Sequence, residues 1–142
     1  MRQKIAFASY LLGGLIPLIF GVIDATTTRF RPFHEVAAGM KWEDVPPGLQ
    51  TVFETMMPLS GLNLTGFSLA LLAIVIFGIR RREAWADWSL LAIMAVIALI
   101  AAYLLYDISA RTGATFPWFG PLIALAFFVV GFVLSTNRRI RS

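Results

Sequence analysis

Long apolar runs separated by short polar connections dominate the pattern of this chain. Each run is long enough, at about 1.5 Å per residue in a helix, to cross the roughly 30 Å hydrocarbon core of a bilayer. We expect four membrane-spanning helices, at residues 5–23, 55–79, 88–106 and 118–134. The sequence therefore predicts a single all-α domain over residues 1–142, an integral membrane four-helix bundle.

The stretch from Pro46 to Arg82 is the longest of these elements. The proline pair predicts a helix start, because a proline in the first helical turn loses no hydrogen bond. A helix from Pro47 to Ile79 would be roughly 50 Å long, which exceeds the core of a bilayer. We expect this helix to project beyond the membrane at its Pro46 end or to bend, with Pro58 as the site of the bend.

The first connection, about residues 24–45, is long and has mixed composition. Phe33, Val36 and Met40 recur in it at helical spacing. This pattern predicts a short amphipathic helix lying at the membrane interface, although Gly39 interrupts it.

Small residues recur every three or four positions within the predicted spans. In the first span they are Ser9, Gly13, Pro17 and Gly21. Helices in lipid associate by close backbone approach at such positions, so we interpret the stripes as packing surfaces. The short later connections predict that spans two, three and four are antiparallel sequential neighbours.

The composition agrees with a membrane protein and excludes several kinds of chemistry. The chain is 58% hydrophobic and only 14% charged, whereas soluble domains are about a quarter charged. The absence of cysteine excludes disulfides and thiolate metal sites, and a single histidine excludes a haem held by two histidines of one chain. Nucleotide-binding loops, zinc helices and nucleophile elbows are also absent. We expect no metal, no cofactor and no nucleic-acid partner.

The arginines and lysines predict the orientation of the chain. Eight of the twelve fall near the N-terminus, in the connection at residues 80–82 and near the C-terminus, and four fall on the other side. Because cytoplasmic loops carry the excess of basic residues, we expect both termini to be cytoplasmic, in an inner or plasma membrane. The preference for arginine over lysine hints at a prokaryote.

Glu54 is the first candidate functional residue, since an ionisable group near a membrane span suggests function. Helical geometry places four small or hydroxylated residues within about 40° of it. These are Pro58, Gly61, Thr65 and Ser68. The alternative is an interfacial carboxylate paired with an arginine of the outer side, or a charge favoured by the helix dipole.

His34 and Asn63 are the next candidates. His34, with an ordinary pKa near 6.5, suits a proton carrier or a pH sensor, and convergence with Glu54 would create an acid–base pair. A structural hydrogen bond at the interface is the alternative. Asn63 lies deeper in the span, where its amide would bond to another helix or contact a ligand.

Aromatic and acidic residues at the same outer level complete the set of ligand-binding candidates. They are Trp42, Tyr106, Asp107 and Trp118. Amphipathic aromatic rings gather at membrane interfaces, so anchoring is the alternative role for the tryptophans and the tyrosine.

Two functions remain open from the sequence. The first is a non-catalytic accessory, assembly or oligomerising subunit, whose partners would be membrane lipids, another membrane protein or a second copy. The second is a lipophilic-ligand-binding protein, or a membrane enzyme, with an outer-leaflet pocket around Glu54 and His34. A transporter is ranked last, because polar residues of the midplane are confined to the second span. The sequence leaves catalytic activity undecided.

Overall fold

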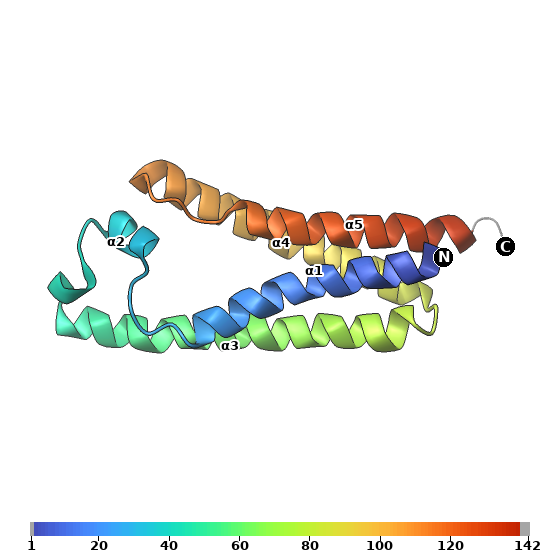
Figure 1. Ribbon diagram of the computed structural model, residues 1–142, viewed down its shortest axis with the longest axis horizontal. Coiled ribbons are helices and arrows are strands. Elements are labelled where there is room, and N and C mark those ends of the chain that lie inside the picture. The colour runs from blue at the N-terminus through green and yellow to red at the C-terminus, as the bar shows by residue number, and fades with distance from the viewer. Residues whose placement is uncertain (1, 140–142) are drawn as a thin grey trace.

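The computed structural model describes the backbone of residues 2–139 and the side chains of residues 2–136, and all its regular elements are helical (Figure 1). Four helices are long and apolar enough to cross a membrane, as expected. The elements in chain order are α1 (Arg2–Ala25), α2 (Pro32–Ala38), the 3₁₀ turn η1 (Trp42–Asp44), α3 (Pro47–Ile74), its π-helical continuation η2 (Val75–Ile79), α4 (Ala84–Thr112) and α5 (Phe119–Arg139).

The long helices are not arranged as simple sequential neighbours. Helix α1 packs along both α3 and α5, and α5 packs against α4. Helices α3 and α4 approach each other mainly where residues 80–83 connect them. The expectation that spans two and three lie side by side is therefore wrong over most of their length. We call the end that carries α2 the α2 end, and the end that carries residues 80–83 the turn end (Figure 1).

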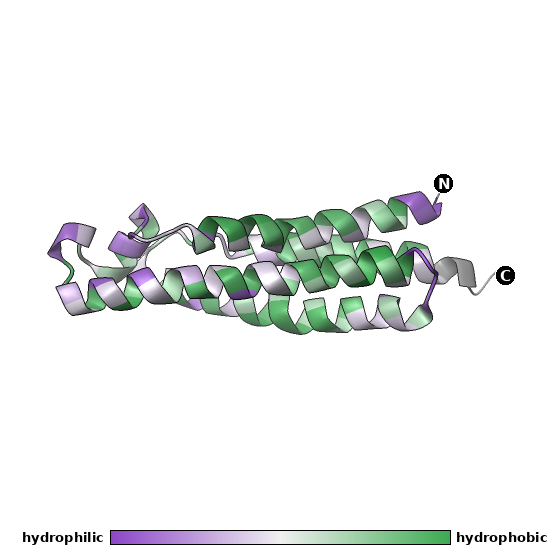
Figure 2. Ribbon diagram, turned by 90° about the horizontal axis from the view of Figure 1, so that it is seen from below, coloured by the Kyte–Doolittle hydropathy of each residue, from purple (hydrophilic) through white to green (hydrophobic). Residues whose placement is uncertain are grey.

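Helix α3 is continuous through Pro58 and extends past the end of α1 toward α2 (Figure 1). Pro58 therefore does not interrupt the helix, and the part of α3 that precedes Gly61 lies beyond the end of α1. Figure 2 shows most hydrophilic residues near the two ends of the molecule and hydrophobic residues along the long helices between them.

The small residues permit the closest helix crossings, as their spacing indicated. A Cβ atom on Gly61 would lie 2.0 Å from the backbone nitrogen of Ala25, and one on Gly21 would lie 2.7 Å from that of Thr65. These distances are far below van der Waals contact, so both crossings of α1 with α3 require glycine. Gly131 of α5 similarly leaves room for the ring of Tyr10.

The turn end holds the apolar core of the molecule. Tyr10 and Phe128 are completely buried and meet edge to face, with ring centroids 5.6 Å apart. The turn itself is tight: Glu83 N–H donates to the Gly78 carbonyl at 3.0 Å, and Arg82 adopts a left-handed φ of 62°. Such a turn holds α3 and α4 together at this end.

The turn end also buries a carboxylate between three helices. Asp87, only 1% exposed, accepts hydrogen bonds from the Tyr10 hydroxyl at 2.9 Å and the Ser135 hydroxyl at 3.1 Å. These bonds connect α4 to α1 and α5. Because a buried carboxylate is stable only with such partners, the cluster fixes the relative depth of the three helices.

The first connection folds as a compact cap at the α2 end. The short helix predicted in this connection is present as α2, and Gly39 ends it in a left-handed conformation with φ 67°. The N–H of Met40 then donates to the Glu35 carbonyl at 3.2 Å, which is the usual geometry of a helix C-terminus.

Candidate functional site

A cavity of about 260 Å³ lies among the four long helices, in the half of the molecule nearer the α2 end. Its walls are contributed by α1, α3, α4 and α5, and all but three of its lining side chains are apolar. The cavity exists because α3 and α4 are close only at the turn end, and because small residues such as Ala98, Ala101 and Gly120 line it. Ile97, 40% exposed, marks a point where the cavity reaches the surface.

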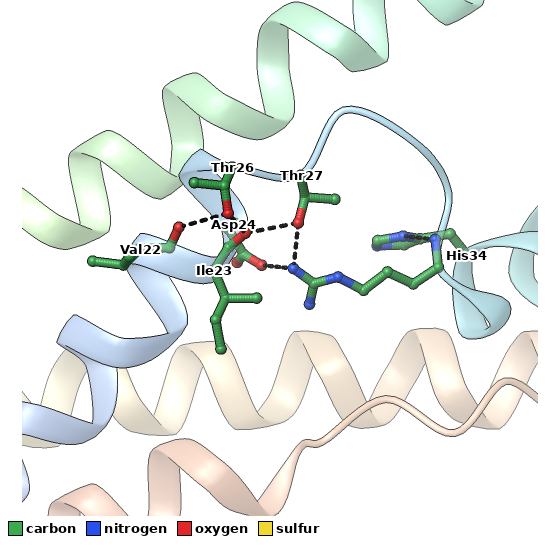
Figure 3. A network of polar contacts seen from close by, with 7 residues as sticks. Val22, Ile23, Asp24, Thr26, Thr27 and His34 are labelled. Carbon is green, nitrogen blue, oxygen red and sulfur yellow. Dashed lines mark hydrogen bonds and ion pairs between the residues drawn. The ribbon is translucent and has the colours of Figure 1, made fainter.

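The three polar lining residues, Asp24, Arg31 and His34, all lie at the α2 end of the cavity. Asp24 belongs to the last turn of α1 and Arg31 immediately precedes α2. One guanidinium nitrogen of Arg31 donates to Asp24 Oδ1 at 2.8 Å and to the Thr27 hydroxyl at 2.6 Å (Figure 3). The ion pair therefore joins the end of α1 to the start of α2.

The end of α1 is shaped to bring this pair together. Thr26 and Thr27 donate their hydroxyls to the carbonyl of Ile23, at 3.0 and 2.7 Å (Figure 3). These bonds satisfy a carbonyl that the helix end leaves without a backbone partner. The chain then turns back over the helix, which places Arg31 beside Asp24.

His34 is held in one orientation by its own backbone neighbour. Its Nδ1 accepts a hydrogen bond from the Arg31 N–H at 3.1 Å, so the neutral ring carries its proton on Nε2. Burial lowers the pKa of His34, the positive charge of Arg31 lowers it further, and Asp24 partly opposes both. His34 is therefore a neutral hydrogen-bond donor at pH 7. No residue in the described part of the chain accepts a bond from Nε2.

Aromatic rings surround His34 and close the cavity at this end. Phe33 and Phe116, which also line the cavity, have ring centroids 4.3 and 5.9 Å from the imidazole. A second group lies behind them, in which Phe30 contacts Trp42 at 5.0 Å and Phe53 at 4.8 Å. We call this set of six residues, His34 included, the aromatic cap.

Backbone and side-chain hydrogen bonds hold the aromatic cap in place. The Trp42 N–H donates to a carboxylate oxygen of Glu35 at 3.1 Å, and Gln50 donates its amide to the Trp42 carbonyl at 2.9 Å. Trp42 is only 7% exposed as a result. It supports the cap from behind and does not line the cavity.

Glu54 does not lie in this cavity. It is exposed, and although its neighbour Phe53 touches the His34 ring at 5.3 Å, only His34 of the expected pair lines the cavity. Gly61 and Ser68, which were predicted to share a face of the helix with Glu54, are buried. However, α1 ends at Ala25 beside Gly61, so the same face is uncovered two turns earlier at Glu54.

The other candidates also lie outside the cavity. Asn63 is exposed on α3, and no described residue forms a hydrogen bond with its amide. Tyr106 and Trp118 contact each other at 6.0 Å on the surface, while Asp107 pairs with Arg111 at 2.9 Å along α4. Their neighbours Leu105 and Pro117 line the cavity instead.

Sequence reasoning missed the two acids that the structure surrounds most closely. Asp24 was not among the candidates, yet it directly follows the first predicted span and lies seven residues before Arg31. Asp87 was not among them either, and it immediately precedes the third predicted span. The sequence gives little indication of the cluster around Asp87, because Tyr10 and Ser135 are distant from it in the chain. Only the similar depth of the three residues in the predicted spans could have suggested the contact.

The cavity presents one histidine donor and one ion pair within apolar walls. No group of three or more potential metal ligands occurs among the described residues. No protein-family model, curated protein or solved structure matches this chain.

Proposed function

We propose that the four long helices form a bundle in an inner or plasma membrane, with both termini and the turn end in the cytoplasm. The distribution of arginine and lysine supports this orientation. The start of α1, the end of α5 and the three arginines before α4 also lie at one end of the molecule (Figure 1). The α2 end then lies at the outer leaflet.

We propose further that the protein binds a lipophilic molecule in the cavity between α1, α3, α4 and α5. The observation that carries this proposal is the combination of apolar walls with three polar residues gathered at one end. Ligand pockets have this composition, and the cavity is slightly smaller than the lower limit of their roughly 300–1,000 Å³ range. A ligand tail would leave past Ile97, where the cavity reaches the surface.

Native mass spectrometry of the protein released from detergent tests this proposal, because it reports bound lipids and subunits together. Ala101→Phe places a ring in the cavity, and we expect it to remove co-purifying lipophilic molecules. Ala92→Phe makes the same change at an exposed position of α4 outside the cavity. Equal retention of ligand by both variants would contradict the proposed site.

A second candidate function is self-association, which we propose from the exposed face of α3. Asn63, Gly66 and Ala70 are all exposed and follow one another at helical spacing. A membrane-exposed amide is stabilised by a partner on another helix, and glycine permits close approach. The subunit count in the same experiment tests this: we expect Asn63→Leu to shift an oligomer toward monomer, with Leu62→Ala as the control.

A further inference from the structure

We propose that the ligand has an uncharged, flat head that presents a carbonyl oxygen, as in the quinone class, and that this oxygen accepts a hydrogen bond from His34 Nε2. The inference rests on the proposed ligand-binding function and specifies the chemistry of that site. Three properties of the α2 end of the cavity support it: its charge balance, its donor and its ring neighbours.

The charge balance of the cavity disfavours an ionic head. Asp24 and Arg31 neutralise each other at 2.8 Å, and among the described residues no other charged side chain lines the cavity. A carboxylate or phosphate head beside Arg31 would also lie beside the Asp24 carboxylate, and an ammonium head beside Asp24 would meet the guanidinium. Like charges at such distances in an apolar environment repel strongly, whereas a neutral head avoids both conflicts.

The donor is defined by the local backbone. The Arg31 N–H occupies Nδ1 of His34, so the second ring nitrogen can only donate. A group that meets it must offer an acceptor, and a carbonyl oxygen is the strongest uncharged acceptor that a lipid head presents. An unpaired N–H in a nonpolar site costs free energy, so supplying the acceptor favours binding.

The ring neighbours favour a flat head. Phe33 and Phe116 both line the cavity beside the imidazole, and their ring centroids lie 4.8 Å from each other. Aromatic faces and edges at these spacings accept a planar conjugated ring by stacking or edge contact. The apolar walls extending toward Met94 and Ile97 would then hold the start of an alkyl or isoprenoid tail.

The test compares four probes with alkyl tails of nine or ten carbons on the intact protein in nanodiscs at pH 7.5. The probes are a decyl-substituted benzoquinone, decanoic acid, decylamine and decylbenzene, and each dissociation constant is measured by competition. We expect the quinone to bind at least tenfold more tightly than the other three. Tightest binding by the acid or the amine would overturn the neutral-head inference while leaving a lipophilic site in place.

The variants locate the interaction at His34. His34→Phe keeps a ring in the aromatic cap but removes the N–H, so we expect roughly three- to tenfold weaker quinone binding and unchanged decylbenzene binding. His34→Gln retains a donor and should recover part of the loss, while Glu54→Gln, outside the cavity, should change nothing. Equal quinone binding by wild type and His34→Phe would overturn the inference.

The probe series remains informative if a variant fails to fold, because it uses the wild-type protein. Failure of all four probes to bind, decylbenzene included, would contradict the proposed ligand-binding function itself. Equal binding of quinone and decylbenzene would contradict only the proposed head group.

Discussion

The two ends of this molecule are built from the same four helices but are packed in different ways. At the turn end, four residues connect α3 to α4, and the side chains of Tyr10, Leu71, Leu90 and Phe128 are almost completely buried. At the α2 end the same helices enclose a cavity. Packing density therefore follows from where the chain connects α3 and α4, and not from hydrophobicity, because the residues that line the cavity are also mostly apolar.

The polar groups of the two ends also differ in how completely they are buried and hydrogen-bonded. Asp87 at the turn end is buried and receives hydroxyl donors from two other helices. At the α2 end Arg31 and Asp24 are about a quarter exposed, and His34 Nε2 faces no described acceptor. Saturated polar clusters fix a structure, whereas incompletely satisfied ones beside a cavity are suited to a ligand.

The largest effect is expected from Gly61→Ala, which adds a Cβ that would overlap the backbone of Ala25. The end of α1 would have to move away from α3, disturbing the α2 end. We expect a loss of about 3 kcal/mol in the free energy of unfolding, measured by denaturation in detergent micelles. Gly66→Ala is the control, because nothing lies within 4 Å of its added Cβ; similar losses in both variants would contradict this account of the crossing.

Tyr10→Phe removes one donor from the buried carboxylate at the turn end. We expect it to lower the free energy of unfolding by about 2 kcal/mol, since a buried acceptor loses a partner. Ligand binding at the other end should not change. Tyr103→Phe, 64% exposed, is the matched control, and a weaker ligand affinity in Tyr10→Phe would show that the two ends are not independent.

Asp24→Asn acts at the α2 end with a smaller cost. Loss of a partly exposed ion pair should lower the stability by about 1 kcal/mol. More informatively, Arg31 then lacks its counter-charge, so decanoic acid should gain affinity relative to the quinone probe. Asp107→Asn removes the exposed pair with Arg111 and should leave that preference as it is.

The smallest effect is a dependence on pH. The pKa of His34 is lowered in the folded protein by burial and by Arg31, so the unfolded chain binds more protons just below its ordinary value near 6.5. Stability contributed by His34 is fully present above that pH and is lost as the pH falls from 6.5 through the lowered pKa. Fluorescence of the buried Trp42 should report this change, and His34→Gln should abolish it.

The four helices that are long and apolar enough to cross a membrane could be predicted from the sequence, but their lateral arrangement could not. Length and hydropathy identify each span, and small residues identify the faces of closest approach, such as Gly21 and Gly61. Lipid-facing and core-facing side chains are both apolar, as Leu99 (exposed) and Leu90 (buried) of α4 illustrate. The pattern along a helix therefore does not identify its neighbour.

The candidate site was predicted in part. The sequence drew attention to His34, which lines the cavity, and also to Glu54, which does not. The difference depends on the position along α3 at which α1 ends. Contacts between segments far apart in the chain set this position. The pairing of Asp24 with Arg31 likewise depends on how the chain turns back over the end of α1.

The contact of Tyr10 with Phe128 and Asp87 has a consequence for the order of assembly during synthesis. Of the four long helices α1 is made first and α5 last, yet each supplies part of the same buried cluster. When α1 is made, neither the carboxylate nor the ring that its tyrosine contacts has been translated. The turn end can reach its final packing only after the last helix has been made.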